Sequence, residues 1–317
     1  MKIALLFPGQ GSQSVGMGKS LYDTFEYTRP IFDVADQMLG FSLTKLMFEG
    51  TDEDLKQTEV TQPAIFTVSC AAFEVFKKEC TNLSSQVAFA AGHSLGEYSA
   101  FYAAGAFDFA TGISLVKARG QAIQKACAQT AGTMAAILGV ERAQLIDLCA
   151  QVTQGSEFCE CVNFNCAGQI VVAGSVCAVQ TLSAKLAEVA GSKVIPLSVS
   201  GAFHSRAMQP AAAEMGNVLF SAKVQNSAIP VYTNVDGKAT QDAELIKQKL
   251  QLQIDHPVLW EDSIAQMMVA GADNFIELGA GRVLSGLMRK IDRKIPVSNI
   301  QDAESAEKLK QTTTLTI

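Results

Sequence analysis

One short segment constrains the fold of this chain more than any other. An apolar run at 87–91 leads directly into Gly92-His-Ser-Leu-Gly96, and good helix formers follow from Glu97 to Ala104. A buried strand, a glycine-flanked turn and a helix in this order form one half of a parallel α/β unit. The segment therefore predicts a parallel sheet covered by helices.

Strand–turn boundaries of the same kind occur near both ends of the chain. The apolar run Ile3–Phe7 ends at Pro8-Gly9-Gln10-Gly11, and Asn274–Leu278 runs into Gly279-Ala-Gly281 before a helical segment at 282–291. We interpret both runs as buried strands of the larger sheet. The last dozen residues, rich in Lys, Gln and Thr, are expected to fray.

The middle of the chain has a different pattern of predicted strands and helices. Its pattern predicts strands at 133–138, 158–163, 169–173 and 193–199, and helices at 142–152 and 176–189. The order β-α-β-β-α-β is that of a split, ferredoxin-like unit. We therefore predict two domains: a large α/β domain made of residues 1–127 and 200–317, and a small α+β domain inserted at 128–199.

Composition narrows the class of protein. In 317 residues, 25 Lys and Arg against 31 Asp and Glu give a net charge of −6, without a long basic run. Nucleic acid and anionic membranes are therefore disfavoured as partners. The apolar runs are shorter than the roughly 18 residues of a membrane span, and the first is too short for a secretory signal. We expect a soluble, cytoplasmic protein.

Eight cysteines raise the question of disulfides or a metal site. A chain of this length does not need disulfides, and a reducing cytosol would not keep them. The tightest cluster has no C-x-x-C pair and no nearby histidine; its members are Cys159, Cys161, Cys166 and Cys177. We interpret them as small buried hydrophobic side chains and expect no metal site.

The segment Gly92–Gly96 fits G-x-S-x-G, the pattern of a nucleophile turn. A serine on a tight strand-to-helix turn crowds its neighbours, so the positions two before and two after Ser94 must lack side chains. This geometry exposes the hydroxyl and makes the backbone N–H of Leu95 a donor to an oxyanion. The alternative is an ordinary glycine-rich turn with a capping serine.

A serine hydroxyl needs a base, and the chain offers three histidines. His93 adjoins Ser94 and should point away from it, and His256 lies in a polar segment typical of the surface. His204 follows the last strand of the small domain, where a cleft between domains would form. We predict His204 as the base, against the alternative of a structural histidine.

Five motifs together carry a family resemblance. They are Phe7-Pro-Gly-Gln-Gly-Ser-Gln13, Gly92-His-Ser-Leu-Gly-Glu97, Lys117-Ala-Arg-Gly120, Gly201-Ala-Phe-His-Ser205 and Glu277-Leu-Gly-Ala-Gly281. In this order and spacing the chain resembles the malonyl-CoA:acyl carrier protein transacylases of bacterial fatty acid synthesis. The resemblance extends to about residue 291 and implies a hydrolase-like large domain with a ferredoxin-like insertion. Two positions depart from the family pattern, Ala280 in place of proline and His256 before Pro257.

The resemblance implies a role for individual residues. Ser94 matches the acylated nucleophile, His204 its base, and Arg119 the arginine that binds the free carboxylate of malonyl. Phe203 matches a bulky phenylalanine that goes with malonyl rather than methylmalonyl units, although a core aromatic is the alternative. Further matches are the oxyanion-hole N–H groups of Gln10 and Leu95, the histidine-orienting carbonyl of Gln253, and the site-lining Gln62, Asn163 and Asn165.

The same resemblance implies malonyl transfer from coenzyme A to the phosphopantetheine thiol of acyl carrier protein. The implied route is a ping-pong reaction through a malonyl-serine, in which the coenzyme A thioester is a substrate and no cofactor is expected. Carrier proteins are acidic and this chain is also acidic, so docking needs a local basic patch. We place part of it at Arg282, Arg289, Lys290, Arg293 and Lys294, with a solvated helix face as the alternative.

Three other functions stay open. A thioesterase of the α/β-hydrolase type would use Ser94, Asp236 and His256, in the order Ser, Asp, His. A discrete polyketide-synthase acyltransferase would share the transferase chemistry and serve a different carrier. A non-catalytic thioester-binding module would leave Ser94 unreactive.

Overall fold

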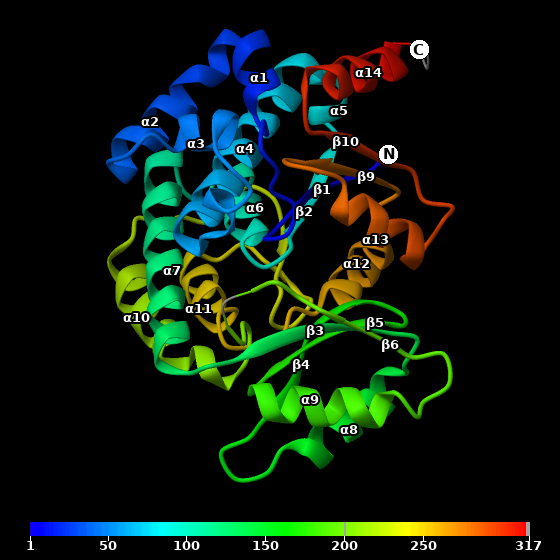
Figure 1. Ribbon diagram of the computed structural model, residues 1–317. Coiled ribbons are helices and arrows are strands. Elements are labelled where there is room, and N and C mark those ends of the chain that lie inside the picture. Colours follow the sequence, from blue (N-terminus) through cyan, green and yellow to red (C-terminus); the bar gives the residue numbers. More distant parts are fainter. Residues whose placement is uncertain (200, 315–317) are drawn as a thin grey trace.

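Two β-sheets organise the computed structural model, which describes residues 1–199 and 201–314 (Figure 1). The larger sheet has the strand order β10-β9-β1-β2-β7-β8. Its strands pair in parallel except for β8, which is antiparallel to β7. Its strands are β1 (Ile3–Phe7), β2 (Val87–Gly92), β7 (Val231–Tyr232), β8 (Ala239–Thr240), β9 (Asn274–Leu278) and β10 (Val297–Ile300).

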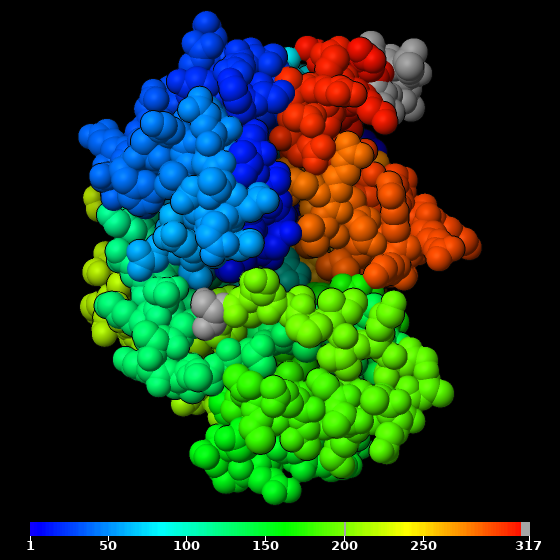
Figure 2. Space-filling view, viewed as in Figure 1, coloured from blue at the N-terminus to red at the C-terminus, as the bar shows by residue number. Residues whose placement is uncertain are grey.

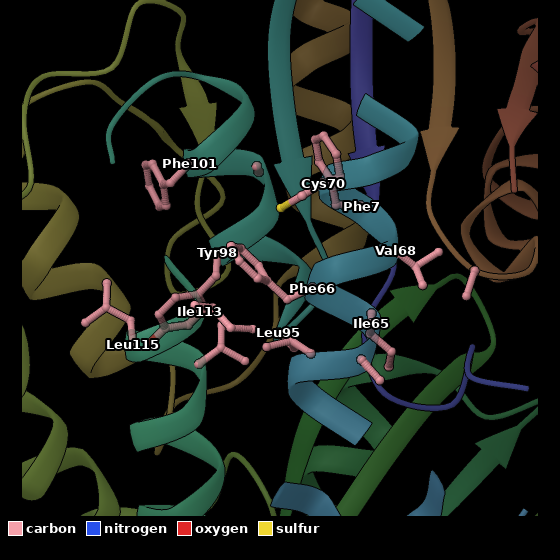
Figure 3. Close-up of a cluster of buried hydrophobic side chains, with 14 of the residues drawn as sticks. Phe7, Ile65, Phe66, Val68, Cys70, Leu95, Tyr98, Phe101, Ile113 and Leu115 are labelled. Carbon is pink, nitrogen blue, oxygen red and sulfur yellow. The ribbon is translucent and has the colours of Figure 1, made fainter. Parts of the chain in front are cut away.

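Helices cover both faces of this sheet, as β1 illustrates. All five residues of β1 are buried, and alternate ones belong to different cores: Leu5 and Phe7 to one, Ala4 and Leu6 to the other. The first core is formed with α4 (Thr58–Glu79), α6 (Gly96–Ala103) and α7 (Phe109–Gln129), and the second with α12 (Trp260–Val269) and α13 (Val283–Ile291). Figure 3 shows side chains of α4, α6 and α7 meeting in the first core.

The smaller sheet has the order β4-β5-β3-β6 and is antiparallel throughout. It consists of β3 (Thr133–Leu138), β4 (Cys159–Cys166), β5 (Gln169–Gly174) and β6 (Lys193–Pro196), with α8 (Arg142–Val152) and α9 (Val176–Leu186) on one face. This strand order is that of the ferredoxin-like unit predicted for the middle of the chain. The predicted fold class, a parallel-sheet α/β domain with a small α+β insertion, is confirmed.

The remaining helices pack around the larger sheet. They are α1 (Lys19–Thr24), α2 (Arg29–Leu39), α3 (Leu43–Glu49), α5 (Thr81–Ser84), α10 (Gln209–Ser221), α11 (Ala243–Leu252) and α14 (Ala303–Thr314), with short 3₁₀ turns η1 (Glu26–Thr28), η2 (Asp54–Lys56) and η3 (Arg206–Met208). The expected fraying of the last dozen residues is wrong up to Thr314, because α14 buries Ala306 and Leu309 in the main core. Residues 315–317 lie outside the described part.

Several segments end elsewhere than predicted. Strand β4 runs three residues beyond its predicted end because Phe164 and Cys166 pair with Ile170 and Gln169 of β5. Val258, far along the chain, adds an isolated bridge to β4: Phe164 N–H donates to Val258 O at 2.9 Å, and Val258 N–H donates to Val162 O at 2.8 Å. Strand β6 stops at Pro196 rather than at 199. The proposed domain boundary at 127/128 falls in the last turn of α7 and stays a prediction.

Three of the four clustered cysteines are buried as expected. Cys177 is exposed, so the prediction is wrong there; it lies on the face of α9 opposite the buried positions Ala178 and Leu182. In the space-filling view, the residues of the smaller sheet and its helices, in green, form one end of the molecule (Figure 2). Among residues 1–199 and 201–314, no helix is both long and apolar enough to cross a bilayer.

Candidate active site

The turn between β2 and α6 carries a strained residue. Ser94 has a backbone φ of +52°, and His204 has a φ of +60°. Within residues 1–199 and 201–314 these are the two non-glycine residues with positive φ. Such a backbone is unfavourable for residues with a side chain and occurs where the surrounding structure enforces it, often at functional sites.

The two glycines that flank Ser94 allow this turn. A Cβ atom on Gly92 would lie 1.9 Å from the backbone of Gly96, and one on Gly96 would lie 2.0 Å from the carbonyl oxygen of Phe7. Both neighbours are backbone atoms that cannot move aside. The prediction that these two positions cannot carry side chains is confirmed.

Ser94 and His204 meet although 110 positions separate them in the chain. The Ser94 hydroxyl lies 2.7 Å from Nε2 of His204, and Nδ1 of the same ring lies 2.7 Å from the main-chain oxygen of Gln253. A carbonyl only accepts hydrogen bonds, so Nδ1 carries the proton and Nε2 is left to accept the serine proton.

The environment keeps the His204 ring neutral. Burial, reinforced by the positive charge of Arg119, lowers the pKa of His204 to about 3. A histidine that is neutral at pH 7 has a free lone pair for a proton. The pair Ser94–His204 therefore has the geometry and the protonation state of a nucleophile with its base.

Arg119, on α7, is a buried cation next to this pair. Its guanidinium donates to Oε1 of Gln62 and to Oε1 of Gln253, each at 2.8 Å, and to the Ser94 hydroxyl at 3.2 Å. In the described part of the chain no carboxylate lies within ion-pair distance of it, and its Nε has no hydrogen-bond partner. A buried charge without a counter-ion favours an anionic ligand.

A cavity of about 370 Å³ opens in front of these groups. The larger sheet contributes the loops after its strands, and the smaller sheet contributes β3, β4 and β5. A second hollow, of about 570 Å³, adjoins it and shares Gln10, Lys56, Ser198 and Val199 with it. Eight of the ten expected site residues line the first cavity: Ser94, His204, Gln10, Arg119, Gln62, Phe203, Asn163 and Asn165.

The other two expected residues lie just behind the cavity. Leu95 is buried directly after Ser94, and Gln253 ends α11 where its carbonyl reaches His204. Within the described residues the backbone N–H groups of Gln10 and Leu95 have no protein acceptor. The Gln10 loop is pressed against the turn, because a Cβ on Gly9 would lie 2.3 Å from the carbonyl oxygen of His93.

Comparisons with known proteins agree with this geometry. Residues 4–316 match the family model described as acyl transferase domain. The malonyl CoA-acyl carrier protein transacylase of Bacillus subtilis is 41% identical over 311 residues, which cover 98% of this chain and 97% of the relative. The chain belongs to the malonyl-CoA:acyl carrier protein transacylase family.

Solved structures of transacylases match over the full length as well. An acyl carrier protein S-malonyltransferase from Vibrio cholerae aligns with a TM-score of 0.91 at 39% identity, covering 98% of this chain and all (100%) of that one. A malonyl-transacylase in complex with a type II polyketide acyl-carrier protein aligns with a TM-score of 0.92 at 35% identity, with the same coverage. The transacylase fold is thus shared along the whole chain.

The thioesterase arrangement is not assembled in this transacylase structure. His256 is exposed, and its Nδ1 lies 2.8 Å from Oδ1 of Asp255. Asp236 accepts from Nζ of Lys249 at 2.8 Å. Nε2 of His93 forms a hydrogen bond with Oδ1 of Asn165 at 2.8 Å. The histidine that contacts Ser94 is therefore His204, and the arrangement of Ser94 with Asp236 and His256 is not formed.

Sequence patterns missed two buried polar residues of the transacylase site. Glu97, in the first turn of α6, accepts from Nε2 of Gln253 at 3.1 Å, and burial raises its pKa to about 8. Asn234 accepts the backbone N–H of Ser94 at 2.7 Å. Glu97 is the last residue of the motif Gly92–Glu97, in which the sequence pattern points only to Ser94 as the reactive residue. Asn234 follows a two-residue strand that no pattern in the sequence reveals.

Proposed function

We propose that this chain transfers a malonyl group from coenzyme A to the pantetheine thiol of an acyl carrier protein through a malonyl ester of Ser94. One observation carries the proposal: the Ser94 hydroxyl lies 2.7 Å from a neutral His204 and 3.2 Å from the buried Arg119. The names of the transacylases it resembles support malonyl and carrier protein as substrates.

The first half-reaction acylates the serine. His204 accepts the proton of Ser94 as the hydroxyl oxygen attacks the thioester carbonyl. The N–H groups of Leu95 and Gln10 receive the negative charge of the tetrahedral oxygen, and loss of one such donor typically costs about 3–4 kcal/mol. The C–S bond then breaks, and His204 returns the proton to the leaving thiolate of coenzyme A.

The second half-reaction reverses these roles. The pantetheine thiol of the carrier protein gives its proton to His204 and attacks the malonyl ester carbonyl. The C–O bond to Ser94 breaks, and the same proton restores the serine hydroxyl. Every proton in this sequence passes through His204, so the proposed steps draw only on the chain, the thioester of malonyl-CoA and the carrier thiol.

Arg119 is proposed to select malonyl. A guanidinium binds a carboxylate through two parallel hydrogen bonds, a pattern that lysine does not reproduce. The acetyl group has no carboxylate and would leave the cation buried without a counter-ion. Phe203 lines the same cavity, where its ring limits the room for an α-methyl group.

We propose that the carrier protein docks beside α13. All five expected basic residues are exposed: Arg282 directly precedes this helix, and the others lie on or after it. Nζ of Lys290 lies 2.6 Å from Oε1 of Gln169, and Gln169 lines the cavity together with Leu284 and Leu287 of α13. The basic surface therefore borders the cavity that holds Ser94. The cytoplasmic location stays a prediction.

Brief exposure to malonyl-CoA followed by mass spectrometry tests the proposed function. We expect one malonyl group on Ser94, none on Ser94→Ala, and transfer of the group to holo acyl carrier protein when this is added. Parallel lines in double-reciprocal plots of the steady-state rates would accompany the covalent intermediate.

Other outcomes of this experiment separate the alternatives. Loss of malonyl to water at the same rate with and without carrier would indicate a thioesterase. The absence of label on Ser94 would indicate a binding module. Faster transfer to a polyketide carrier than to a fatty acid carrier would change the proposed partner, and the relative solved with a polyketide carrier makes that comparison worthwhile.

A further inference from the structure

A single buried amide holds the turn that carries Ser94. Asn234, with 1% of its surface exposed, follows β7, the strand that pairs in parallel with β2. Its Oδ1 accepts the backbone N–H of Ser94 at 2.7 Å, and its Nδ2 donates to the carbonyl oxygen of Gly92 at 2.7 Å. The amide therefore bridges the last residue of β2 and the strained residue of the turn.

Only a group with one donor and one acceptor satisfies both contacts. The primary amide of asparagine provides this pair in one plane. In the opposite orientation its NH₂ group would face the N–H of Ser94 and its oxygen would face the carbonyl of Gly92. An ionised aspartate would place a second oxygen against the carbonyl of Gly92. An alanine would leave a backbone N–H and a carbonyl buried without these partners.

The backbone around Asn234 is itself held in place by hydrogen bonds. The main-chain oxygen of Asn234 accepts the N–H of Leu259 at 2.8 Å, directly before α12. The loop around it is closed by Thr233 N–H, which donates to Lys238 O at 3.1 Å, and by Gly237 N–H, which donates to Thr233 O at 3.0 Å. Asn234 can therefore resist relaxation of the neighbouring turn instead of following it.

We infer that Asn234 is a positioning residue for Ser94, an inference that rests on the proposed function. It holds the backbone of Ser94 at positive φ, so that the hydroxyl stays on Nε2 of His204. It also occupies the N–H of Ser94, which leaves the N–H of Leu95 as the donor that this turn offers to an oxyanion. Acylation of Ser94 then depends on Asn234, whereas binding of malonyl-CoA does not.

The variants Asn234→Ala and Asn234→Asp test this inference, with Asn226→Asp as the matched control. Asn226 also accepts a backbone N–H, that of Ala243 at 2.9 Å, but on an exposed surface. The readouts are the single-turnover rate of Ser94 acylation by malonyl-CoA and the Kd of malonyl-CoA in a Ser94→Ala background. We expect an acylation rate about 100-fold lower at pH 8, an unchanged Kd, and wild-type behaviour of the control.

The pH dependence of Asn234→Asp gives a second readout, which also serves if Asn234→Ala does not fold. A protonated aspartic acid restores one donor and one acceptor, so its acylation rate relative to wild type should rise between pH 8 and pH 5. The relative rate of Asn234→Ala should stay flat. The imidazole of His204, whose pKa is lowered to about 3, stays neutral across this range. Glu97, whose pKa burial raises to about 8, titrates at the upper end of the range in wild type and variants alike, so the ratio to wild type and the comparison with Asn234→Ala remove its contribution.

Three results would overturn the inference: acylation of both variants within about threefold of wild type, an equal loss of malonyl-CoA affinity, or no recovery of Asn234→Asp at low pH. A wild-type chain that is not acylated would instead count against the proposed function, so the two failures are distinguishable.

Discussion

Arg119 is a charged side chain whose contacts are neutral amides, a hydroxyl and an aromatic ring. The oxygen atoms of Gln62 and Gln253 satisfy part of the guanidinium but do not neutralise it, and the ring of Tyr98 lies below it with its centroid 5.8 Å away. Burial of an uncompensated charge costs several kcal/mol, which a bound carboxylate would recover in part. The environment of this one residue therefore predicts substrate choice.

Replacement of Arg119 by alanine should reduce malonyl transfer far more than acetyl transfer. Removal of a charge-assisted, bidentate contact in a buried site corresponds to about 3–5 kcal/mol, or roughly a 10²–10⁴-fold loss in kcat/KM for malonyl-CoA. The measurement compares kcat/KM for the two thioesters. The exposed Arg142, which pairs with Asp262, supplies the control Arg142→Ala. An equal loss for both thioesters would remove Arg119 from the specificity role.

Glu97 should make stability depend on pH. Burial raises its pKa from 4.5 to about 8 in the folded chain, so the stabilising effect of its proton is complete below pH 4.5 and is lost as the pH rises to about 8. His204 acts in the opposite direction, because its lowered pKa costs stability as the pH falls below 6.5.

The variant Glu97→Gln isolates the first of these effects. It keeps an acceptor for Gln253 and removes the titration, so the Tm of the variant minus that of the wild type should increase from pH 5 to pH 8. Glu188→Gln, at an exposed position, is the control. A Tm difference that is constant over this range would show that Glu97 titrates normally.

The strand–turn–helix unit from β2 to α6 explains why glycine is required on both sides of Ser94. A Cβ atom added at Gly92 or at Gly96 would lie 1.9 or 2.0 Å from a backbone atom, which is far closer than van der Waals contact allows. No side-chain rotation relieves such a contact, so a substitution must separate the elements. The arrangement couples the packing of α6 on the sheet to the position of Ser94.

Replacement of Gly96 by alanine should therefore both destabilise the fold and abolish acylation. We expect a decrease of about 3 kcal/mol or more in the free energy of unfolding, measured with urea. Gly286 is the matched control, because it lies in helix α13 and a Cβ added there would meet no atom within 4 Å. Gly286→Ala should raise stability by about 0.5–1 kcal/mol. Wild-type acylation by Gly96→Ala would contradict the packing argument.

The molecule as a whole is acidic, yet its proposed partner is acidic too. Association then depends on where the basic residues lie and not on their total number. Lys290, near the end of α13, contacts Gln169 of the cavity wall, and Arg293 follows the helix; both are exposed and distant in sequence from Ser94 and His204. Docking and chemistry are therefore predicted to be separable.

The double variant Lys290→Glu/Arg293→Glu should weaken the carrier step alone. We expect the KM for holo acyl carrier protein to rise about tenfold at low salt, with a smaller effect at high salt, because screening removes long-range attraction. The rate of Ser94 acylation by malonyl-CoA should not change. Lys185→Glu, exposed on α9, is the control. An unchanged KM would discard the basic patch.

Local patterns were sufficient to predict the fold class and the parts of the site that lie near each other in the chain. Alternation of buried residues, glycine-rich turns and helix-forming runs are properties of short windows, so β1, β3, α8 and β9 begin and end where expected. The turn at Ser94 belongs to the same class, because its tightness demands glycine at two nearby positions. His204 was selected because only three histidines exist and one follows a domain boundary.

Contacts between distant segments are invisible to such patterns. Val258 forms a bridge to β4 although it lies far along the chain. Glu97 is neutral because it is buried, and Asn234 accepts the backbone N–H of Ser94 from 140 positions away. Packing decides which groups form these hydrogen bonds and which side chains are buried, and the residue type alone does not determine either. The tertiary structure therefore decides that a serine, a histidine and an arginine line one cavity, with the serine hydroxyl within hydrogen-bond distance of the other two.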